Sequence, residues 1–268
     1  MNYFVDNQAI SYEHVGETHW GKDIVLVEQA DDLTMSTPWA ATGFTVEDLF
    51  EPALFDQFLA ATKKQLRALW RAAGLTIDDS FELTQYHHAA STQEVHLKAV
   101  DKTKLLSTEN FPVDIRLLEQ RISQICAVPL KVFNPFDRQS AFHYRVVRPR
   151  AQDNNPLHRD VWLEDYDNCI NLYIPIAGSD KNSSLILGPG THRWRESDIA
   201  ISNGGALING QRFNVPAVTD CKRPLHLVRP NPGMNQVLIF SPYLIHGGAA
   251  NLNADATRIS IEVRLWRV

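Results

Sequence analysis

The sequence contains few cysteines and no long apolar run, and these absences exclude several classes of protein. Among its 268 residues are three cysteines, Cys126, Cys169 and Cys221, which lie far apart and form no Cys-x-x-Cys pair. An odd number of widely spaced thiols argues against a disulfide framework or a thiolate zinc site and fits a reducing compartment. No segment approaches the roughly eighteen consecutive apolar residues of a transmembrane helix, and residues 1–28 lack the pattern of a signal peptide, so we expect neither.

The sequence also lacks long runs of charged residues of one sign. The net charge is −5, and acidic and basic residues are scattered without a long run of either. Proteins that bind nucleic acids usually carry a basic patch or stripe, which is missing from this sequence. With 44% hydrophobic residues, the chain can bury a substantial core. We therefore expect a soluble cytoplasmic protein that acts on a small molecule, with no nucleic-acid or membrane partner, and the sequence specifies no oligomeric state.

Residues 1–130 form the part of the chain that the sequence predicts to be rich in helices. Pro52 suits an early helical position, apolar residues then recur at helical spacing, and Gly74 is a plausible stop. A second apolar stripe predicts another helix from Asp114 to Ala127. The polar stretch 85–104 between these helices is expected to be a surface hairpin or loop.

From about residue 130 the sequence changes to short runs of β-forming residues separated by turns. The breaks contain proline, glycine, asparagine and aspartate, and many short strands in series favour a sandwich or small barrel over an alternating βαβ fold. We expect one domain, residues 1–268, that is mainly β, with flanking helices from residues 1–130 packed against a β core from residues 130–268. The expected strands are Leu130–Asn134, Phe142–Val147, Cys169–Ile176, Ser184–Leu187, Leu225–Val228, Gln236–Phe240 and Arg258–Trp266.

Two histidines and an aspartate are candidate metal ligands. His158 and Asp160 are separated by one residue, so in an extended segment both side chains point to the same face. His246 follows a strongly β-forming run and precedes a glycine, which lets a ligand approach closely. Two imidazoles and one carboxylate with open coordination positions favour non-haem Fe(II) and oxygen chemistry. The alternative is that His158 and Asp160 form an ordinary surface pair and that His246 is a hydrogen-bonded core histidine. Taken one at a time, the residues favour this alternative.

A second group of candidate residues lies on the last expected strand. Polar and apolar residues alternate from position 258 to 265, so Arg258 and Ser260 share one face, and Glu262 and Arg264 continue this polar row. The planar guanidinium of Arg258 can hold a carboxylate through two parallel hydrogen bonds, and the Ser260 hydroxyl adds a third donor. This pair could bind the distal carboxylate of a 2-oxoglutarate cosubstrate. The alternative for Glu262 and Arg264 is an exposed ladder of opposite charges.

These residues carry a resemblance to a known family. The His-x-Asp pair, the second histidine and the Arg-x-Ser pair resemble the phytanoyl-CoA dioxygenase-like branch of the Fe(II)/2-oxoglutarate-dependent oxygenases. The run Leu185–His192 is similar to that branch's proline–glycine–small–histidine turn, and Asn171–Ile176 and Phe240–Gly247 match two of its strands. One departure is Ser183–Ser184, where the family often has glycine. The resemblance covers roughly residues 140–266 and implies a double-stranded β-helix, or jelly-roll, cupin-like fold.

The resemblance also implies the cofactors and the reaction. It implies Fe(II) held by the histidine–aspartate–histidine triad and a 2-oxoglutarate that joins this iron to Arg258. Asn171 or Tyr173 would also contact the cosubstrate, whereas His192 would brace its turn. With O2, oxidative decarboxylation would release succinate and CO2 while a substrate C–H bond is hydroxylated. Related halogenases replace the carboxylate ligand by a small residue, so Asp160 implies hydroxylation, or a variant such as desaturation, over halogenation.

Two other interpretations of the site stay open. A cupin-type enzyme could use another divalent metal for isomerisation or hydrolysis, but it would not need the Arg-x-Ser pair. A catalytically inactive jelly-roll protein could bind a ligand without turnover, but the complete set of site residues argues against it. A kinase catalytic loop is excluded because the chain has no glycine-rich phosphate loop and no Asp-Phe-Gly motif. The turn at Gly188–Gly190 also lacks the Gly-Lys-Ser/Thr ending of a phosphate-binding loop.

The substrate leaves a weaker signal in the sequence. The N-terminal half and residues 203–222 are expected to shape its pocket. A surplus of arginine and histidine near the proposed site suggests a polar or anionic small molecule. The candidate substrate-binding residues are His143, Arg145, Trp162 and Lys98.

Overall fold

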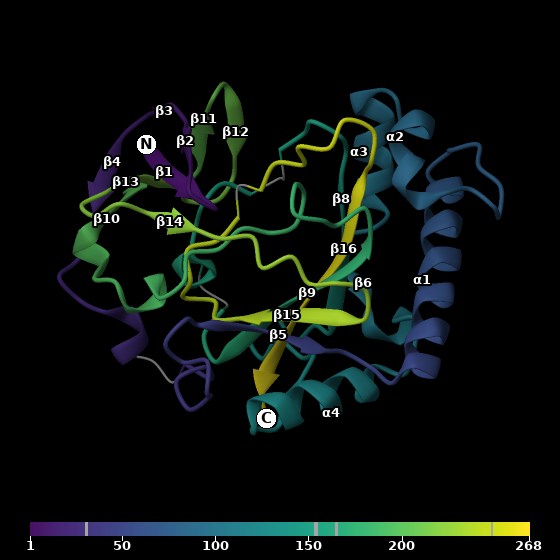
Figure 1. Cartoon of the computed structure of the whole chain (residues 1–268), viewed down its shortest axis with the longest axis horizontal. Coiled ribbons are helices and arrows are strands. Elements are labelled where there is room, and N and C mark those ends of the chain that lie inside the picture. Colours follow the sequence, from purple (N-terminus) through teal and green to yellow (C-terminus); the bar gives the residue numbers. More distant parts are fainter. Residues whose placement is uncertain (30–31, 153–154, 164–165, 248) are drawn as a thin grey trace.

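The central feature of the protein is a large antiparallel sheet (Figure 1). A computed structural model describes residues 1–29, 32–152, 155–163, 166–247 and 249–268. The sheet has the order β5-β15-β9-β16-β8-β6, with β7 also paired to β16, and every pair is antiparallel. Its strands are β5 (Phe44–Asp48), β6 (Leu106–Ser107), β7 (Leu130–Lys131), β8 (Ala141–Val147), β9 (Cys169–Ala177), β15 (Gln236–Phe240) and β16 (Arg258–Arg267).

Three small sheets lie at the opposite end of the molecule from helices α1 to α3 (Figure 1). Their orders are β14-β1-β2, β13-β10-β4 and β12-β11-β3, so the first strands of the chain pair with strands near residues 200–227. The part of the chain that was expected to be rich in helices therefore begins with short strands, which were not predicted from the sequence. The strands are β1 (Asn2–Val5), β2 (Gln8–Ser11), β3 (His14–Val15), β4 (Thr18–Trp20), β10 (Ile199–Ser202), β11 (Ala206–Ile208), β12 (Gln211–Phe213), β13 (Val218–Cys221) and β14 (His226–Leu227).

A second wall faces the large sheet and completes a jelly roll. Single antiparallel bridges join His158 to His246, His246 to Leu187, and Leu187 to Val228. Leu187 packs in one apolar cluster with Tyr173 of the large sheet, so the two walls enclose a shared interior. Among the described strands the large sheet follows an open path from β5 to β6, so the fold is a jelly roll without the closed barrel that the sequence left possible.

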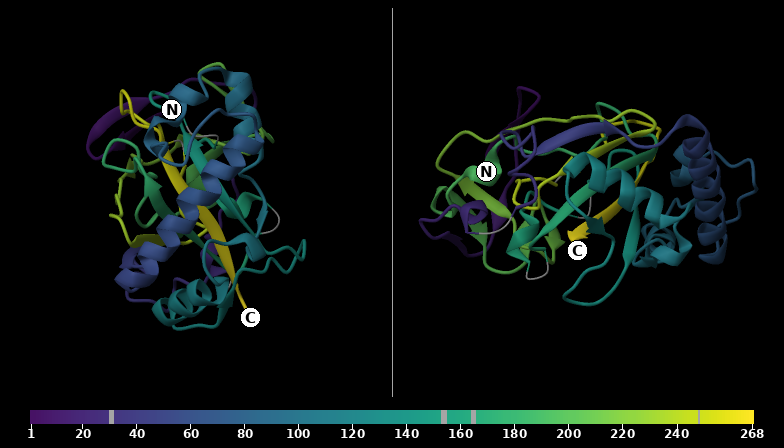
Figure 2. Two further views of the ribbon diagram at one scale, coloured as in Figure 1. Left: turned by 90° about the vertical axis from the view of Figure 1, so that its right-hand side faces the viewer. Right: turned by 90° about the horizontal axis from the view of Figure 1, so that it is seen from below.

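Helices cover the outer face of the large sheet (Figure 2). Seen from the side, α1 passes in front of β16, and apolar residues of both elements belong to one buried core. Phe58 and Trp70 of α1 and Leu118 of α4 are fully buried in this core, as expected for amphipathic helices. The helices are α1 (Pro52–Ala72), α2 (Tyr86–Ala89), α3 (Gln93–Asp101) and α4 (Ile115–Cys126). Short 3-10 helices are η1 (Leu26–Glu28), η2 (Leu83–Gln85), η3 (Thr108–Asn110), η4 (Asp160–Trp162), η5 (Thr191–Arg193) and η6 (Glu196–Asp198).

Helix ends explain which helical predictions succeeded. Pro52 opens α1, and Asp114 caps α4 by accepting a hydrogen bond from the Arg116 amide at 3.0 Å, so both predicted helices are confirmed. The stretch 85–104 is not a hairpin or open loop but contains α2 and α3. Thr92 caps α3 by accepting from Val95 at 3.2 Å, and this capping signal outweighs the polar composition of the stretch.

Several of the strand predictions are confirmed. Gln236–Phe240 is β15, and the predictions for β9 and β16 differ from the observed strands by one residue at the C-terminal end. The segment Ser184–Leu187 forms no regular strand and pairs only through Leu187, because the Ser184 amide donates to the Asp180 carbonyl at 2.9 Å in a turn. The runs predicted at Leu130–Asn134 and Leu225–Val228 shorten to two-residue strands.

Two exclusions made from the sequence can be compared with the structure. Cys126, Cys169 and Cys221 are free thiols, as their spacing predicted. Among the described residues, no helix combines the length and the apolar character that crossing a lipid bilayer requires.

Candidate metal centre

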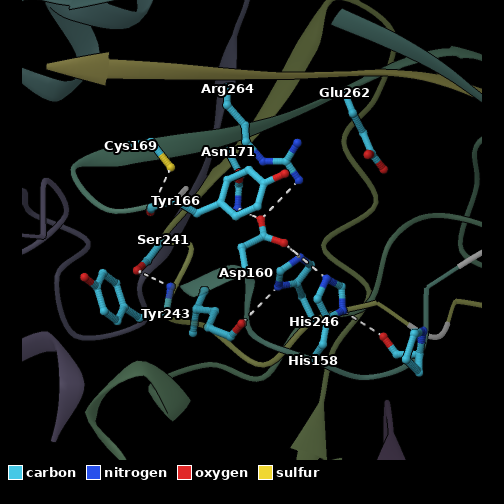
Figure 3. Close-up of polar contacts among 12 residues, drawn as sticks. His158, Asp160, Tyr166, Cys169, Asn171, Ser241, Tyr243, His246, Glu262 and Arg264 are labelled. Atoms are coloured by element: carbon cyan, nitrogen blue, oxygen red, sulfur yellow. Dashed lines mark hydrogen bonds and ion pairs between the residues drawn. The ribbon is translucent and has the colours of Figure 1, made fainter. Parts of the chain in front are cut away.

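His158, Asp160 and His246 converge on one point between the two walls of the jelly roll (Figure 3). Their candidate ligand atoms all lie within 4.8 Å of one another. Nε2 of His158 is 3.1 Å from Oδ1 of Asp160, and Nε2 of His246 is 3.7 Å from the same oxygen. The three residues are only 2%, 1% and 6% exposed. The structure thus brings together the triad that the sequence predicted.

Backbone pairing explains why these residues meet. The His158 and His246 amides each donate to the other residue's carbonyl at 2.9 Å, which fixes the two histidines side by side. Arg159 is extended, with φ −111° and ψ 137°, so His158 and Asp160 point to the same side as their spacing predicted. The Asp160 amide donates to the Pro242 carbonyl at 3.0 Å and ties the first ligand segment to the chain that carries the second histidine.

Each imidazole is oriented by a bond from its other nitrogen. Nδ1 of His158 lies 2.8 Å from the Pro156 carbonyl, and Nδ1 of His246 lies 2.9 Å from the Leu244 carbonyl. Since a carbonyl only accepts, both Nδ1 atoms carry a proton, and both Nε2 atoms are left facing Asp160. Burial lowers the pKa of His246 to about 4, although Asp160 opposes the shift, so this ring is neutral at neutral pH. Neutral imidazoles are the form that binds metal ions.

One oxygen of the Asp160 carboxylate is held by neighbouring side chains. Its Oδ2 accepts from Nδ2 of Asn171 at 2.8 Å and from Nη2 of Arg264 at 3.3 Å. Burial opposes ionisation of Asp160, but the positive charge of Arg264 outweighs it and keeps its pKa well below the usual range. Asp160 is therefore an anion at neutral pH with Oδ1 directed at the histidines. The sequence placed Arg264 in the polar row but gave no indication of this contact.

Arg159, between the two ligands, has a structural role that the sequence did not indicate. Its side chain is completely buried on the face opposite the triad, where it donates to Glu196 and to the Thr191 carbonyl. Glu196 also accepts from Nε1 of Trp162 at 2.8 Å. These contacts anchor the first ligand segment to the η5–η6 region, so Trp162 supports the ligand loop. The only feature of the sequence that could have indicated this role is the position of Arg159 between two candidate ligands.

The polar row of β16 lines the interior, as the alternation predicted. Arg258 and Ser260 are fully buried and are not among the described cavity residues, while Ile259 and Ile261, which alternate with them, belong to the outer core. The Ser260 hydroxyl has no hydrogen-bond partner among the described residues. The Arg258 guanidinium lies 5.7 Å from the centre of the Tyr173 ring on the neighbouring strand.

The exposed ladder considered for Glu262 and Arg264 is wrong. Their side chains are 19% and 18% exposed, and both line a cavity beside the triad. Asn171 and Tyr173 line the same cavity, and the Tyr173 hydroxyl bonds to Ser179 at 2.7 Å. The cavity walls are formed by Arg145, Asn155, His158, Asn171, Leu172, Tyr173, Leu185, Phe240, His246, Gly247, Glu262, Val263 and Arg264.

The candidate substrate-binding residues divide into two groups. Arg145 lines the cavity and donates from Nε to Oε2 of Glu262 at 2.7 Å. His143 lies in an adjoining recess with Arg264, where its Nδ1 accepts from the Leu105 amide at 3.0 Å. Trp162 and Lys98 are not among the described cavity residues, and Lys98 forms an exposed pair with Glu94 at 2.8 Å. The described lining also contains no residue from 203–222 or from the chain before Arg145, contrary to expectation.

His192 lies outside the triad. Its Nε2 is 2.9 Å from the Ala40 carbonyl, so Nε2 donates to that carbonyl and holds the loop before β5. Burial lowers the pKa of this imidazole, which keeps it neutral. This bracing contact agrees with the role expected from the turn motif.

The described residues fit a divalent metal and an anionic cosubstrate. Two imidazole nitrogens and one carboxylate oxygen are a donor set suited to Fe(II) with open positions. The buried hydroxyl of Ser260 is a hydrogen-bond donor without an acceptor among the described residues. It lies on the same strand as the Arg258 cation. Both features face the interior that the two walls enclose.

Comparison with known proteins supplies a family and two similar structures. A model of the family described as phytanoyl-CoA dioxygenase (PhyH) matches residues 39–260. No curated protein matches the chain. The crystal structure of AviO1 from Streptomyces viridochromogenes Tue57 is similar at 15% identity and a TM-score of 0.45, covering 84% of this chain and 90% of that one. The crystal structure of EvdMO1 is similar at 17% identity and a TM-score of 0.44, covering 85% of this chain and 48% of that one.

Proposed function

The chain belongs to the phytanoyl-CoA dioxygenase family, whose chemistry is of the Fe(II)/2-oxoglutarate oxygenase type, and from this premise we propose that it is an Fe(II)- and 2-oxoglutarate-dependent dioxygenase. The proposed reaction hydroxylates a C–H bond of a polar small molecule and releases succinate and CO2. The observation that carries the proposal is the convergence of three buried donor atoms within 4.8 Å, beside the cavity that Glu262 and Arg264 of β16 line.

In this proposal His158, Asp160 and His246 hold Fe(II). When bound, the iron supplies, with 2-oxoglutarate and O2, the oxidising power for C–H hydroxylation. The Nδ1–H bonds to the Pro156 and Leu244 carbonyls keep both Nε2 atoms aimed at the ion. Asn171 and Arg264 fix the carboxylate so that its free oxygen stays directed at the same point.

The distal carboxylate of the cosubstrate is assigned to Arg258 and Ser260. A guanidinium and a hydroxyl on one strand face offer three converging donors to a carboxylate. Both side chains are buried, so their bonds to an anion form with little competition from water. Tyr173, whose ring lies beside the Arg258 guanidinium, would flank the cosubstrate.

The substrate side of the cavity is assigned to the Arg145–Glu262 pair. The two side chains are 20% and 19% exposed and bond at 2.7 Å on the inner face of adjacent strands β8 and β16. A half-buried cation and anion facing a cavity can each hydrogen-bond a polar ligand group. This arrangement supports a polar metabolite as substrate.

The test is an anaerobic titration of metal-free protein with Fe(II) and then 2-oxoglutarate, monitored by the visible charge-transfer absorption of the chelate. We expect the band in the wild type and its loss in His246→Ala. In Arg258→Met the band should need roughly 10- to 100-fold more 2-oxoglutarate, because a charge-assisted hydrogen bond contributes about 1.5–3 kcal/mol. Arg267→Met, at the exposed end of β16, is the matched control and should behave as the wild type.

Two other outcomes would redirect the assignment. If Fe(II) binds but no band forms, the cosubstrate site is wrong, and a cupin-type metal enzyme without 2-oxoglutarate takes precedence. If no metal binds to the wild type, the triad is not a metal site, and a ligand-binding role without catalysis takes precedence.

A further inference from the structure

A second group of metal-ligating side chains lies on the surface, apart from the central triad. His87 and His88 belong to α2, and Asp255 lies in the loop that leads into β16. Nε2 of His87 is 2.9 Å and Nε2 of His88 is 3.2 Å from the same oxygen, Oδ1 of Asp255. Donors that each lie about 2.0–2.2 Å from one ion at tetrahedral or octahedral angles are themselves about 2.8–3.5 Å apart. The observed spacing therefore suits a shared ion.

The ring of His87 is also oriented as a ligand would be. Its Nδ1 lies 3.0 Å from Oγ1 of Thr257, so one nitrogen is occupied and Nε2 remains for an ion. Metal-binding histidines usually have their second ring nitrogen tied to a hydrogen-bond partner in this way. The Thr257 amide in turn donates to the Thr84 carbonyl at 2.8 Å, which holds the loop against the segment before α2.

From this geometry we propose that His87, His88 and Asp255 form a second, surface site for a divalent transition-metal ion such as Zn²⁺. Two imidazole nitrogens select zinc and its neighbours over magnesium and calcium, which prefer oxygen ligands. The side chains of His87, His88 and Asp255 are 15%, 61% and 69% exposed, so the remaining coordination positions face solvent. An ion here exchanges with the solution more readily than one in the buried triad.

A bound ion would connect two distant parts of the chain. His87 and Asp255 are 168 positions apart, and Asp255 precedes Arg258 by three residues. The ion would thus fasten α2 to the loop that positions the first residue of β16. This inference does not depend on the proposed function, because it concerns different ligands.

The test is a calorimetric titration of the metal-free protein with Zn²⁺. We expect two equivalents in the wild type, one in His88→Ala and one in Asp255→Asn. His246→Ala should also bind one equivalent, held by the surface site. His226→Ala, which removes an exposed imidazole on β14, is the control and should keep the wild-type stoichiometry.

If the wild type binds only one equivalent and His88→Ala binds none, the surface site stands and the central triad does not bind zinc. Unchanged stoichiometry and affinity in both His88→Ala and Asp255→Asn would overturn the proposal.

Thermal unfolding gives an independent readout. In the His246→Ala background, Zn²⁺ should raise the unfolding temperature, since an ion that binds only the folded state stabilises it. The rise should vanish when His88→Ala is added to that background. Because His88 is largely exposed, its removal should leave the fold intact in the absence of metal. A temperature rise of equal size in both proteins would contradict the assignment.

Discussion

Among single residues, Ser260 is unusual because its buried hydroxyl costs free energy in the ligand-free protein. Its hydroxyl is fully buried, yet no described group forms a hydrogen bond with it. A buried polar group without a partner costs about 1–3 kcal/mol, so folded proteins retain few of them away from functional sites. The hydroxyl therefore lowers the stability of the ligand-free protein, and this cost is offset when an acceptor such as a carboxylate binds beside it.

Replacing Ser260 by alanine should separate binding from stability. Because the hydroxyl has no described partner, Ser260→Ala should not lower the free energy of unfolding of the ligand-free protein and should raise it by up to about 3 kcal/mol. The concentration of 2-oxoglutarate needed for half-saturation should rise roughly tenfold, since one hydrogen bond to a charged group is lost. Denaturant unfolding and the charge-transfer titration measure the two effects.

Ser241→Ala is the matched control for this substitution. Ser241 is equally buried, but its hydroxyl donates to Asp32 at 2.7 Å and accepts from the Tyr243 amide at 3.1 Å. Its loss should lower the free energy of unfolding by about 1–3 kcal/mol. A comparable loss in Ser260→Ala would show that the Ser260 hydroxyl already has a partner in the free protein.

The contacts of individual site residues show where sequence reasoning stops. The spacing of His158 and Asp160 sufficed to place them on one side, because an extended chain alternates its faces. The bond from Arg264 to Asp160 could not be foreseen in this way. It depends on the antiparallel register of β16 against β9, which pairs Arg264 with Asn171 and brings both to the carboxylate.

Among the elements, the junction of β9 and β16 depends on one glycine. Gly178 follows β9 with φ +62°, a conformation that is costly for residues with a Cβ atom. A Cβ atom there would lie 2.1 Å from the Thr257 carbonyl oxygen, directly before Arg258. The absence of a side chain thus lets the end of β9 pack against the start of β16.

Gly178→Ala should therefore disturb both stability and cosubstrate binding. The backbone conformation costs about 1–2 kcal/mol and the steric overlap about 1–3 kcal/mol more, so we expect the free energy of unfolding to fall by roughly 2–5 kcal/mol. Displacement of Thr257 should also raise the 2-oxoglutarate requirement, because Arg258 moves with it. Denaturant unfolding and the charge-transfer titration report these changes.

The control glycine isolates the backbone contribution. Gly204 has φ +71°, and no described atom lies within 4 Å of the position its Cβ would take. Gly204→Ala should lose only about 1–2 kcal/mol and keep the wild-type titration. An equal decrease in the free energy of unfolding in Gly178→Ala and Gly204→Ala would mean that the close approach to Thr257 does not contribute to the effect.

For the whole molecule, buried histidines make stability depend on pH. Burial lowers the pKa of both His96 and His143 from 6.5 to about 4. Between these values the unfolded chain takes up protons that the folded protein does not. The stability that the neutral rings contribute is therefore present above pH 6.5 and is lost as the pH falls toward 4.

His96→Gln should reduce this loss of stability in acid. His96 is buried beside Tyr86, whose hydroxyl lies 3.0 Å from its Nδ1, and glutamine keeps a hydrogen-bonding group without titrating. Between pH 7 and 4.5 the variant should lose about 1–2 kcal/mol less than the wild type, once screening by solvent is allowed for. Denaturant unfolding across this range gives the slope, and His226→Gln at an exposed position serves as control. Identical slopes in His96→Gln and wild type would contradict the prediction.

The fold as a whole was predictable where local pattern and tertiary pairing agree. Runs of β-forming residues predicted β9, β15 and β16, and apolar stripes predicted α1 and α4. The strands β1 to β4 are two to four residues long, and β4 exists through pairing with β10, which brings Trp20 opposite Ala200. Such distant pairing leaves no local periodicity, so these strands were not predicted from the sequence.

The division of β16 into two faces has a consequence for how this protein can change. Positions such as Glu262 touch the cavity, whereas Ile259 and Ile261 belong to the outer core. A deletion of one residue would exchange the faces and disrupt both, but substitutions at alternate positions leave the core untouched. A mutant library that seeks new substrates should therefore vary alternate positions of this strand. The chemistry of the cavity can then diversify on an unchanged scaffold.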